Sequence, residues 1–259
     1  MRATSFRLRR TAAWTAVLVS LILVGAMPAA AQDVGESIPG IGPAGDVQRL
    51  HTGFGFTEGP AADAGGNVYF TDVRNQRIHK VDRERNLSTF REESGRANGL
   101  MFNSEGELVA CQMIGRLVKL SRDGSRLEVL ADQYEGNRFN APNDLVIDRP
   151  GGVYFTDPAF GAGRPLPQPV HGVYYRAPDG TVTRLIDDLR FPNGVILSPD
   201  EKTLYVVPTG QPEVMAYPVS APGTLETGRV LCRLKQAEGR TGGGGDGLTV
   251  DTDGNLYIT

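Results

Sequence analysis

The sequence predicts an all-β protein built from repeated four-stranded sheets, the arrangement of a β-propeller. Three observations support this fold class. A unit of about 45 residues recurs along the chain, each unit joins a polar turn to an alternating apolar run, and no helical periodicity occurs beyond the N-terminal segment. Glycine makes up 33 of the 259 residues, which suits many tight turns between short strands. A two-sheet sandwich would use similar strands but would not require the repeat.

The clearest element of each unit is a polar turn followed by an alternating strand, the second strand of its sheet. Asn, Asp and Gly favour the tight turn, while β-branched and aromatic residues favour the strand. This element recurs five times, at residues 63–71, 103–111, 148–156, 198–207 and 251–259.

A third strand follows in four of the units, and in most of them a turn and a fourth strand come after it. The third strands are predicted at residues 77–81, 116–120, 172–176 and 213–217, and fourth strands at 127–130 and 182–186. Four short antiparallel strands in each repeat of about 40–50 residues are typical of a propeller blade.

The strand count predicts four full blades between residues 54 and 234 and a fifth that begins at 247–259. Residues 47–51 are placed to supply the outer strand of the last blade. We therefore expect a propeller domain at 47–259 that is incomplete at its C-terminus, with about four and a half blades. Its unpaired edges should favour aggregation, whereas a chain extended by the missing strands should be a monomer.

The first 31 residues have the features of a secretory signal peptide. Four arginines among the first ten residues precede an apolar run at 12–25, and small residues follow, which places cleavage near Ala31. The run is shorter than the ~20 residues of a membrane-spanning helix, although an uncleaved anchor is the alternative. The sequence thus predicts a signal at 1–31, a linker at 32–46, and a secreted or periplasmic protein without a membrane association after signal removal. The general and the twin-arginine export routes both stay open.

One polar residue opens the first strand of each unit, at the same phase of the repeat. These residues are Glu58, Asn98, Asn143, Asn193 and Asp246, at intervals of 40, 45, 50 and 53 residues. The first strand of a propeller blade lines the central channel, so equivalent positions should form a ring at one depth. Asn and Asp also cap strand entries, which is the alternative reading of each residue alone.

The predicted ring offers only oxygen ligands, two of them carboxylates. Hard cations prefer this set, and Ca²⁺ suits it best because it accepts irregular geometry and many oxygens. Another divalent cation is possible, but zinc is a poor match because the ring contains neither His nor Cys.

At these residues the sequence resembles the SMP-30/gluconolactonase family of six-bladed calcium propellers. The resemblance covers residues from about 50 to 259. Its motifs are FTEGP (56–60), RFNAPNDL (138–145), GGVYFTDP (151–158), FPNGV (191–195), SPDEKTLYV (198–206) and DGLTVD (246–251).

The resemblance implies a six-bladed propeller in which Glu58, Asn143, Asn193 and Asp246 hold the metal. It also implies lactone hydrolysis of the gluconolactonase type, with organophosphate hydrolysis in some relatives. The cation would polarise the lactone carbonyl, and Asp246 would act as general base on water, or as a nucleophile. Asn98 and Asn143 would orient the substrate.

Other readings of the sequence stay open. Arg138 is a candidate for contact with substrate hydroxyls, and a surface arginine is the alternative. The ring would equally suit a related ester or phosphotriester hydrolase, while a binding propeller with a structural ion is the alternative from another class. His171 follows a Pro-rich loop and is a further candidate for substrate contact.

Charge and cysteine content exclude two further classes. A formal net charge of −3 provides no basic face for nucleic acid. Cys111 and Cys232 are too few for a disulfide scaffold. Because they belong to different blades, their Cα atoms should lie beyond the ~7 Å that a disulfide can bridge. We expect two free and mostly buried thiols.

Overall fold

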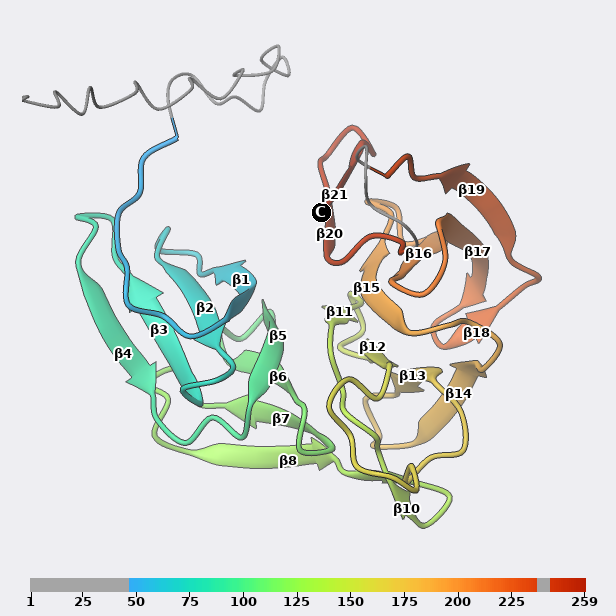
Figure 1. The fold of residues 1–259 in the computed structure, drawn as a ribbon, viewed down its shortest axis with the longest axis horizontal. Coiled ribbons are helices and arrows are strands. Elements are labelled where there is room, and N and C mark those ends of the chain that lie inside the picture. Colours follow the sequence, from blue (N-terminus) through green and yellow to red (C-terminus); the bar gives the residue numbers. More distant parts are fainter. Residues whose placement is uncertain (1–46, 237–242) are drawn as a thin grey trace, which may run out of the picture. The chain divides into compact units, whose positions relative to one another are not determined.

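A computed structural model describes residues 47–236 and 243–259, and all regular secondary structure in these ranges is β-strand (Figure 1). The chain divides into two units, Met1–Arg49 and Leu50–Thr259, and every strand in the described ranges belongs to the second. The predicted signal and linker, 1–31 and 32–46, lie outside the described residues. Within the described part of the chain, no helix has the length and hydropathy needed to span a bilayer.

The first three large sheets are four-stranded, antiparallel and formed by strands that are consecutive within each sheet. The first contains β1 (Thr57–Ala62), β2 (Val68–Asp72), β3 (Arg77–Val81) and β4 (Leu87–Arg91). The second contains β5 (Ala97–Phe102), β6 (Leu108–Gln112), β7 (Arg116–Leu120) and β8 (Leu127–Ala131). The third contains β11 (Leu145–Ile147), β12 (Val153–Asp157), β13 (Gly172–Arg176) and β14 (Val182–Ile186).

The fourth sheet has an additional short strand, and two small hairpins complete the described chain. The fourth sheet contains β15 (Pro192–Leu197), β16 (Thr203–Pro208), β17 (Glu213–Ala221) and β19 (Arg229–Arg233), with β18 (Thr224–Leu225) paired to the end of β17. The hairpins are β9 (Gln133–Tyr134) with β10 (Asn137–Arg138), and β20 (Leu248–Val250) with β21 (Leu256–Ile258).

The prediction of four full blades and the start of a fifth is confirmed by these sheets. The second strands coincide with the predicted turn-strand elements, because each apolar alternation matches the two faces of one strand. The hairpin of β9 and β10 was not predicted. Residues 47–56 form no strand, and the role of residues 47–51 in an outer strand of the last blade stays a prediction.

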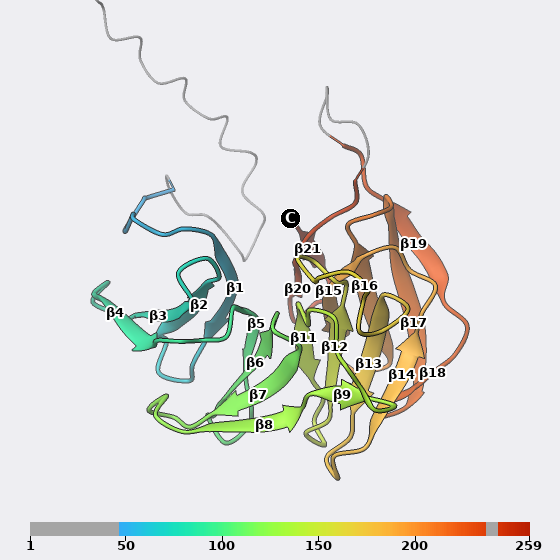
Figure 2. The same ribbon diagram turned by 60° about the horizontal axis from the view of Figure 1, so that its bottom comes forward.

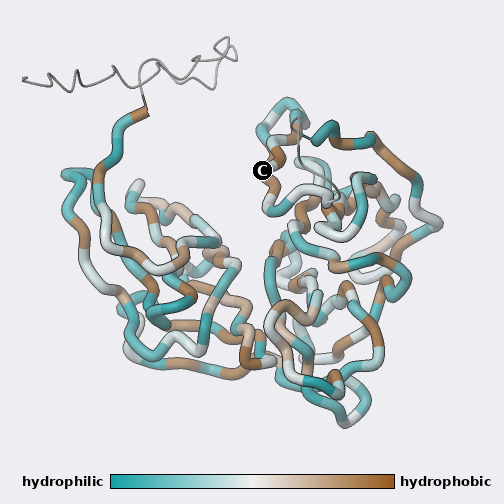
Figure 3. The backbone as a smooth tube through the Cα atoms, viewed as in Figure 1, coloured by the Kyte–Doolittle hydropathy of each residue, from teal (hydrophilic) through white to brown (hydrophobic). Residues whose placement is uncertain are grey.

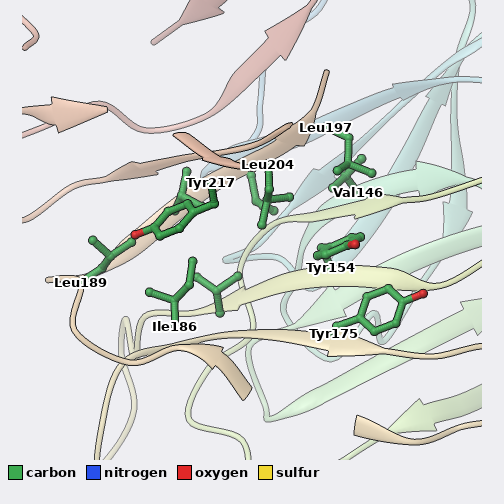
Figure 4. Close-up of a cluster of buried hydrophobic side chains, with 11 residues drawn as sticks. Val146, Tyr154, Tyr175, Ile186, Leu189, Leu197, Leu204 and Tyr217 are labelled. Carbon is green, nitrogen blue, oxygen red and sulfur yellow. The ribbon is translucent and has the colours of Figure 1, made fainter. Parts of the chain in front are cut away.

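The hydrophobic core lies between successive sheets, as sheet-on-sheet packing requires. The cluster in Figure 4 joins the third sheet to the fourth, with Tyr154 of β12 and Leu204 of β16 both nearly inaccessible to solvent. Similar clusters join the first sheet to the second and the second to the third. Figure 3 shows hydrophobic and hydrophilic stretches alternating along the chain. Each sheet therefore depends on its neighbours to bury its faces.

The first strands of neighbouring sheets lie next to one another (Figure 2), and glycines occur where they approach most closely. The amide of Gly99 donates to the Asn143 carbonyl at 2.7 Å, and the amide of Gly194 donates to the Asp246 carbonyl at 2.9 Å. A Cβ on Gly59 would lie 2.1 Å from the Asn98 carbonyl oxygen. The glycines after Glu58, Asn98 and Asn193 thus let the next first strand lie alongside.

Gly59→Ala should destabilise the protein through both backbone conformation and crowding. Gly59 has a φ of +49° in addition to the close carbonyl, and left-handed backbone costs other residues about 1–2 kcal/mol. Overpacking adds about 1–3 kcal/mol, so the free energy of unfolding should fall by at least about 2 kcal/mol. Urea unfolding measures the change.

Gly136→Ala is the matched control for this glycine. Its φ of +78° carries the same backbone cost, but no atom lies within 4 Å of its Cβ position. An equal loss of stability in the two variants would contradict the role assigned to the close approach.

The cysteines confirm the blade assignment but only half of the burial prediction. Both are free thiols; Cys111 of β6 is buried, whereas Cys232 of β19 is exposed. The expectation of a buried Cys232 was wrong because β19 is an outer strand whose residues are mostly exposed. Burial raises the pKa of the Cys111 thiol well above its ordinary value.

In a titration with a thiol reagent, we expect the native, unreduced protein to expose one reactive thiol and the denatured protein two. Cys232→Ser should abolish the fast phase, while Cys111→Ser should leave it unchanged. Two fast-reacting thiols in the native protein would contradict the packing of β6 between its neighbours.

Candidate functional site

The five predicted ring residues line one cavity of about 780 Å³. Glu58, Asn98 and Asn193 lie on β1, β5 and β15, while Asn143 and Asp246 lie just before β11 and β20. Each residue therefore comes from the start of the first strand of a different sheet. The repeat phase brings residues together that are up to 188 positions apart in the sequence.

The three amides are buried and the two carboxylates are more accessible. Asn98, Asn143 and Asn193 are each about 5–6% exposed, Glu58 is half-buried, and Asp246 is exposed. The Asn193 amide nitrogen donates to Asp246 Oδ1 at 2.6 Å and to Thr209 Oγ1 at 2.8 Å. Both amide hydrogens are thus engaged, and Oδ1 of Asn193 is the atom left to face a cation.

The carboxylates of the site repel one another in the absence of a cation. Burial raises the pKa of Glu58, and the nearby charge of Asp246 raises it further. Behind the ring, burial raises the pKa of the Asp144 carboxyl to about 7, although the amides of Val195 and Leu145 donate to it. A bound cation would relieve this repulsion, so the electrostatics favour positive charge at the ring.

Two aspartates at the ends of second strands hold the ring strands in place. Asp157 of β12 is fully buried, and its carboxylate accepts the Asn140 amide at 2.8 Å and the Ala141 amide at 2.6 Å, three and two residues before Asn143. Asp72 of β2 binds the amides of residues 55 and 56 in the same way before Glu58. The repeat therefore supplies a buried brace for two of the five ring positions.

The cavity walls contain side chains that the sequence did not single out. Arg74, Arg96 and Lys235 bring positive charge, and Phe56, Met113 and Phe160 provide an apolar surface. Several of these residues directly follow a second strand, where the chain leaves the sheet at the cavity. In the sequence these segments have the pattern of ordinary turns, so no signal there singled out Arg74 or Met113.

The other predicted substrate contacts do not line this cavity. Arg138 is exposed on β10 and donates to the Ile114 carbonyl. His171 packs its ring against Phe191, 4.3 Å between centroids. The predicted substrate contacts of both residues stay predictions, whereas Asn98 and Asn143 do reach the cavity.

The donor set fits a hard cation. Among the residues that the structure describes, no group of three or more His, Cys, Asp or Glu side chains is placed to bind a metal. The ring instead combines two carboxylates with neutral amides, a set that suits Ca²⁺ and limits the like charge at the site. The spare Oδ1 of Asn193 and the raised pKa of Glu58 are consistent with such a ligand.

Repeated antiparallel sheets with a polar ring at their first strands define the chain as a β-propeller with an oxygen-lined cavity. The sequence-family model described as the SMP-30/gluconolactonase/LRE-like region matches residues 56–259. The chain belongs to this family, as its sequence motifs predicted.

Known proteins of the family are similar over most of the chain. A gluconolactonase of Zymomonas mobilis is 31% identical over 82% of this chain and 67% of its own length. A Staphylococcus aureus lactonase is 28% identical over 78% of this chain and 62% of its own length. The solved structure of a Xanthomonas campestris gluconolactonase superposes with a TM-score of 0.73 at 30% identity, covering 81% of this chain and 71% of that one. The chain thus spans about two thirds of the length of these curated relatives.

Proposed function

We propose that this protein is a divalent-cation-dependent hydrolase that opens a sugar lactone. The observation that carries the proposal is the convergence of Glu58, Asn98, Asn143, Asn193 and Asp246 on one cavity. Membership in the gluconolactonase family and similarity to proteins named as lactonases support the reaction class. Calcium is the proposed cation because every ring ligand is an oxygen atom.

The chain's own residues have distinct tasks in this reaction. Glu58, Asn143, Asn193 and Asp246 would hold the cation. When bound, a calcium ion supplies electrostatic stabilisation to the developing oxyanion of the lactone. Asp246 is accessible from the cavity and would accept a proton from the attacking water, while the N–H of Asn193 holds its carboxylate in place.

Hydrolysis of the lactone requires only the substrate and one water molecule. The water oxygen bonds to the acyl carbon, the ester bond to the ring oxygen breaks, and that oxygen takes a proton as the hydroxy acid forms. Asn98 and Asn143 present buried amides that would orient the substrate hydroxyls. An activated ester such as a lactone suits a base whose strength a neighbouring cation would lower.

The test is hydrolysis of glucono-δ-lactone by the 259-residue chain with calcium, with excess EDTA, and with calcium restored. We expect EDTA to abolish turnover and calcium to recover it, and Glu58→Gln to weaken calcium binding in calorimetry. Full turnover in EDTA would overturn the cation dependence. If only a simple ester or a phosphotriester is hydrolysed, the substrate belongs to that class and is not a sugar lactone. Calcium binding with no hydrolysis of any of these substrates would favour a binding propeller.

We also propose that the protein is exported, on the strength of the basic and apolar pattern at 1–31. N-terminal sequencing of the protein made in a bacterial host tests this. A mature chain that begins near residue 32 in the periplasm or medium is expected, and an intact N-terminus in the cytoplasm would contradict the proposal.

A further inference from the structure

The cavity that holds the ring is positively charged once a divalent cation is present. Its lining includes three cationic side chains, Arg74, Arg96 and Lys235, against the two carboxylates of Glu58 and Asp246. A bound divalent ion would bring the net charge of the lining to +3, although the whole chain has a net charge of −3. A positively charged cavity attracts anionic ligands, even when the protein as a whole carries a negative net charge.

Arg74 is the cation best placed to bind such a ligand directly. It follows β2 at the cavity, is exposed, and holds its guanidinium over the Phe56 ring, 5.8 Å from the centroid. No carboxylate in the described part of the chain forms an ion pair with it, whereas Arg77 nearby pairs with Glu92. The guanidinium therefore has free donors, and stacking on Phe56 restricts its position.

Arg96 is more confined than Arg74. A Cβ on Gly161 would lie 3.2 Å from the Arg96 guanidinium, so the loop that follows β12 passes directly against it. The same loop carries Phe160 into the cavity wall. Arg96 thus adds positive charge to the cavity, but its guanidinium is held against the loop. The guanidinium N–H groups of Arg74 are more accessible to a ligand.

We propose that the site selects lactones that carry a second, anionic group, a phosphate or a carboxylate, and that Arg74 binds this group. The proposal rests on the proposed function. The ester end of such a substrate would lie at the ring, and its anion would meet the fork of donors on Arg74, which matches the geometry of either oxyanion. A neutral lactone would offer Arg74 only hydroxyl acceptors, without a charge to pair with the guanidinium.

The test compares glucono-δ-lactone with its 6-phosphate and with the lactone that has a carboxylate at carbon 6. With calcium, we expect kcat/KM for at least one anionic substrate to exceed that of the neutral lactone by about tenfold or more. The two anionic arms distinguish phosphate from carboxylate. Arg74→Gln should abolish the preference, and Arg74→Lys should recover part of it. The matched control is Arg83→Gln, which removes an equal charge from the exposed turn between β3 and β4.

A binding measurement separates this inference from the lactonase itself. Calorimetry with gluconate and 6-phosphogluconate, the products of two of these reactions, requires no turnover. Tighter binding of the phosphate that depends on Arg74 would support the anion site even if no lactone is hydrolysed. Equal kcat/KM for the neutral and anionic lactones together with equal affinity for gluconate and 6-phosphogluconate in wild type, or a preference that survives in Arg74→Gln, would overturn it.

Discussion

Asp246→Asn should lower kcat for lactone hydrolysis by about 10²–10⁴-fold, the usual contribution of a general base. Asn occupies the same volume and keeps an oxygen that can accept the N–H of Asn193, which Asp246 Oδ1 now accepts at 2.6 Å. Because Asp246 is exposed at the cavity, the fold should be retained. Turnover at saturating calcium separates the loss of the base from weaker metal binding, since added calcium can restore only the latter.

Asp253→Asn is the matched control for this variant. Asp253 is an exposed carboxylate in the turn between β20 and β21 and does not line the cavity. Its replacement removes an equal charge from the hairpin that follows Asp246 and should leave kcat unchanged. An Asp246→Asn protein with more than a tenth of wild-type turnover would rule out the proposed role of Asp246.

An isotope experiment distinguishes the two chemical roles of Asp246. In a single turnover in ¹⁸O-labelled water, a general base leaves the protein unlabelled and places the label directly in the acid product. A nucleophile would form a mixed anhydride with the acyl group; when water opens it at the Asp246 carbonyl, the first product keeps an oxygen of Asp246 and Asp246 becomes labelled, so a labelled Asp246 identifies a nucleophile. Mass spectrometry of the peptide that contains Asp246 reports the difference.

The ring could be predicted from the sequence because the repeat fixes both the strand and the end of the strand on which each polar residue lies. Asn98 and Asn193 are 95 residues apart, yet each opens the first strand of its sheet, and these strands converge on one cavity. The blade count followed from the same periodicity. Local pattern was sufficient because each repeat packs against the next one along the chain.

The cavity walls could not be predicted in this way because they depend on where the chain goes after it leaves a strand. Arg74 follows β2 in a segment that reads as an ordinary turn, and only the packed sheets show that this turn borders the cavity. Arg138 precedes Asn143 by five residues, but the hairpin of β9 and β10 holds it against Ile114. Cys232 shows a related limit, since the repeat places this residue in the outermost strand of its sheet but does not show that the strand leaves it exposed.

Asp157→Asn should destabilise the protein and weaken calcium binding together. The buried carboxylate accepts the amides of Asn140 and Ala141 through its two oxygens. Asparagine places an NH₂ group against one of these N–H donors, and one buried donor loses its partner. The free energy of unfolding should fall by about 1–3 kcal/mol. Calcium affinity should fall about tenfold or more, as is usual when a residue that supports a metal ligand is changed.

The pH of the measurement matters because burial raises the pKa of Asp157 to about 7. This folded-state value lies above the ordinary 3.8, so the contribution of the group to stability is full at low pH and declines as the pH rises towards 7. Unfolding at about pH 8, above the folded-state pKa, therefore compares an ionised carboxylate with the amide. At that pH, the difference in the free energy of unfolding between wild type and Asp157→Asn reflects the two hydrogen bonds and not the binding of a proton to Asp157.

Two further variants determine whether the effect comes from the brace or from the lost charge. Asp72→Asn removes the equivalent carboxylate in the first sheet, which holds the segment before Glu58, and should weaken calcium binding likewise. Asp187→Asn removes an exposed carboxylate whose contact with Arg184 spans 3.6 Å and should change stability by less than about 1 kcal/mol. Calcium affinity that is unchanged in both Asp157→Asn and Asp72→Asn would show that the ring holds its geometry without these braces. Because each brace ends a second strand and fixes the first strand of its own sheet, we expect the losses in the two variants to be similar.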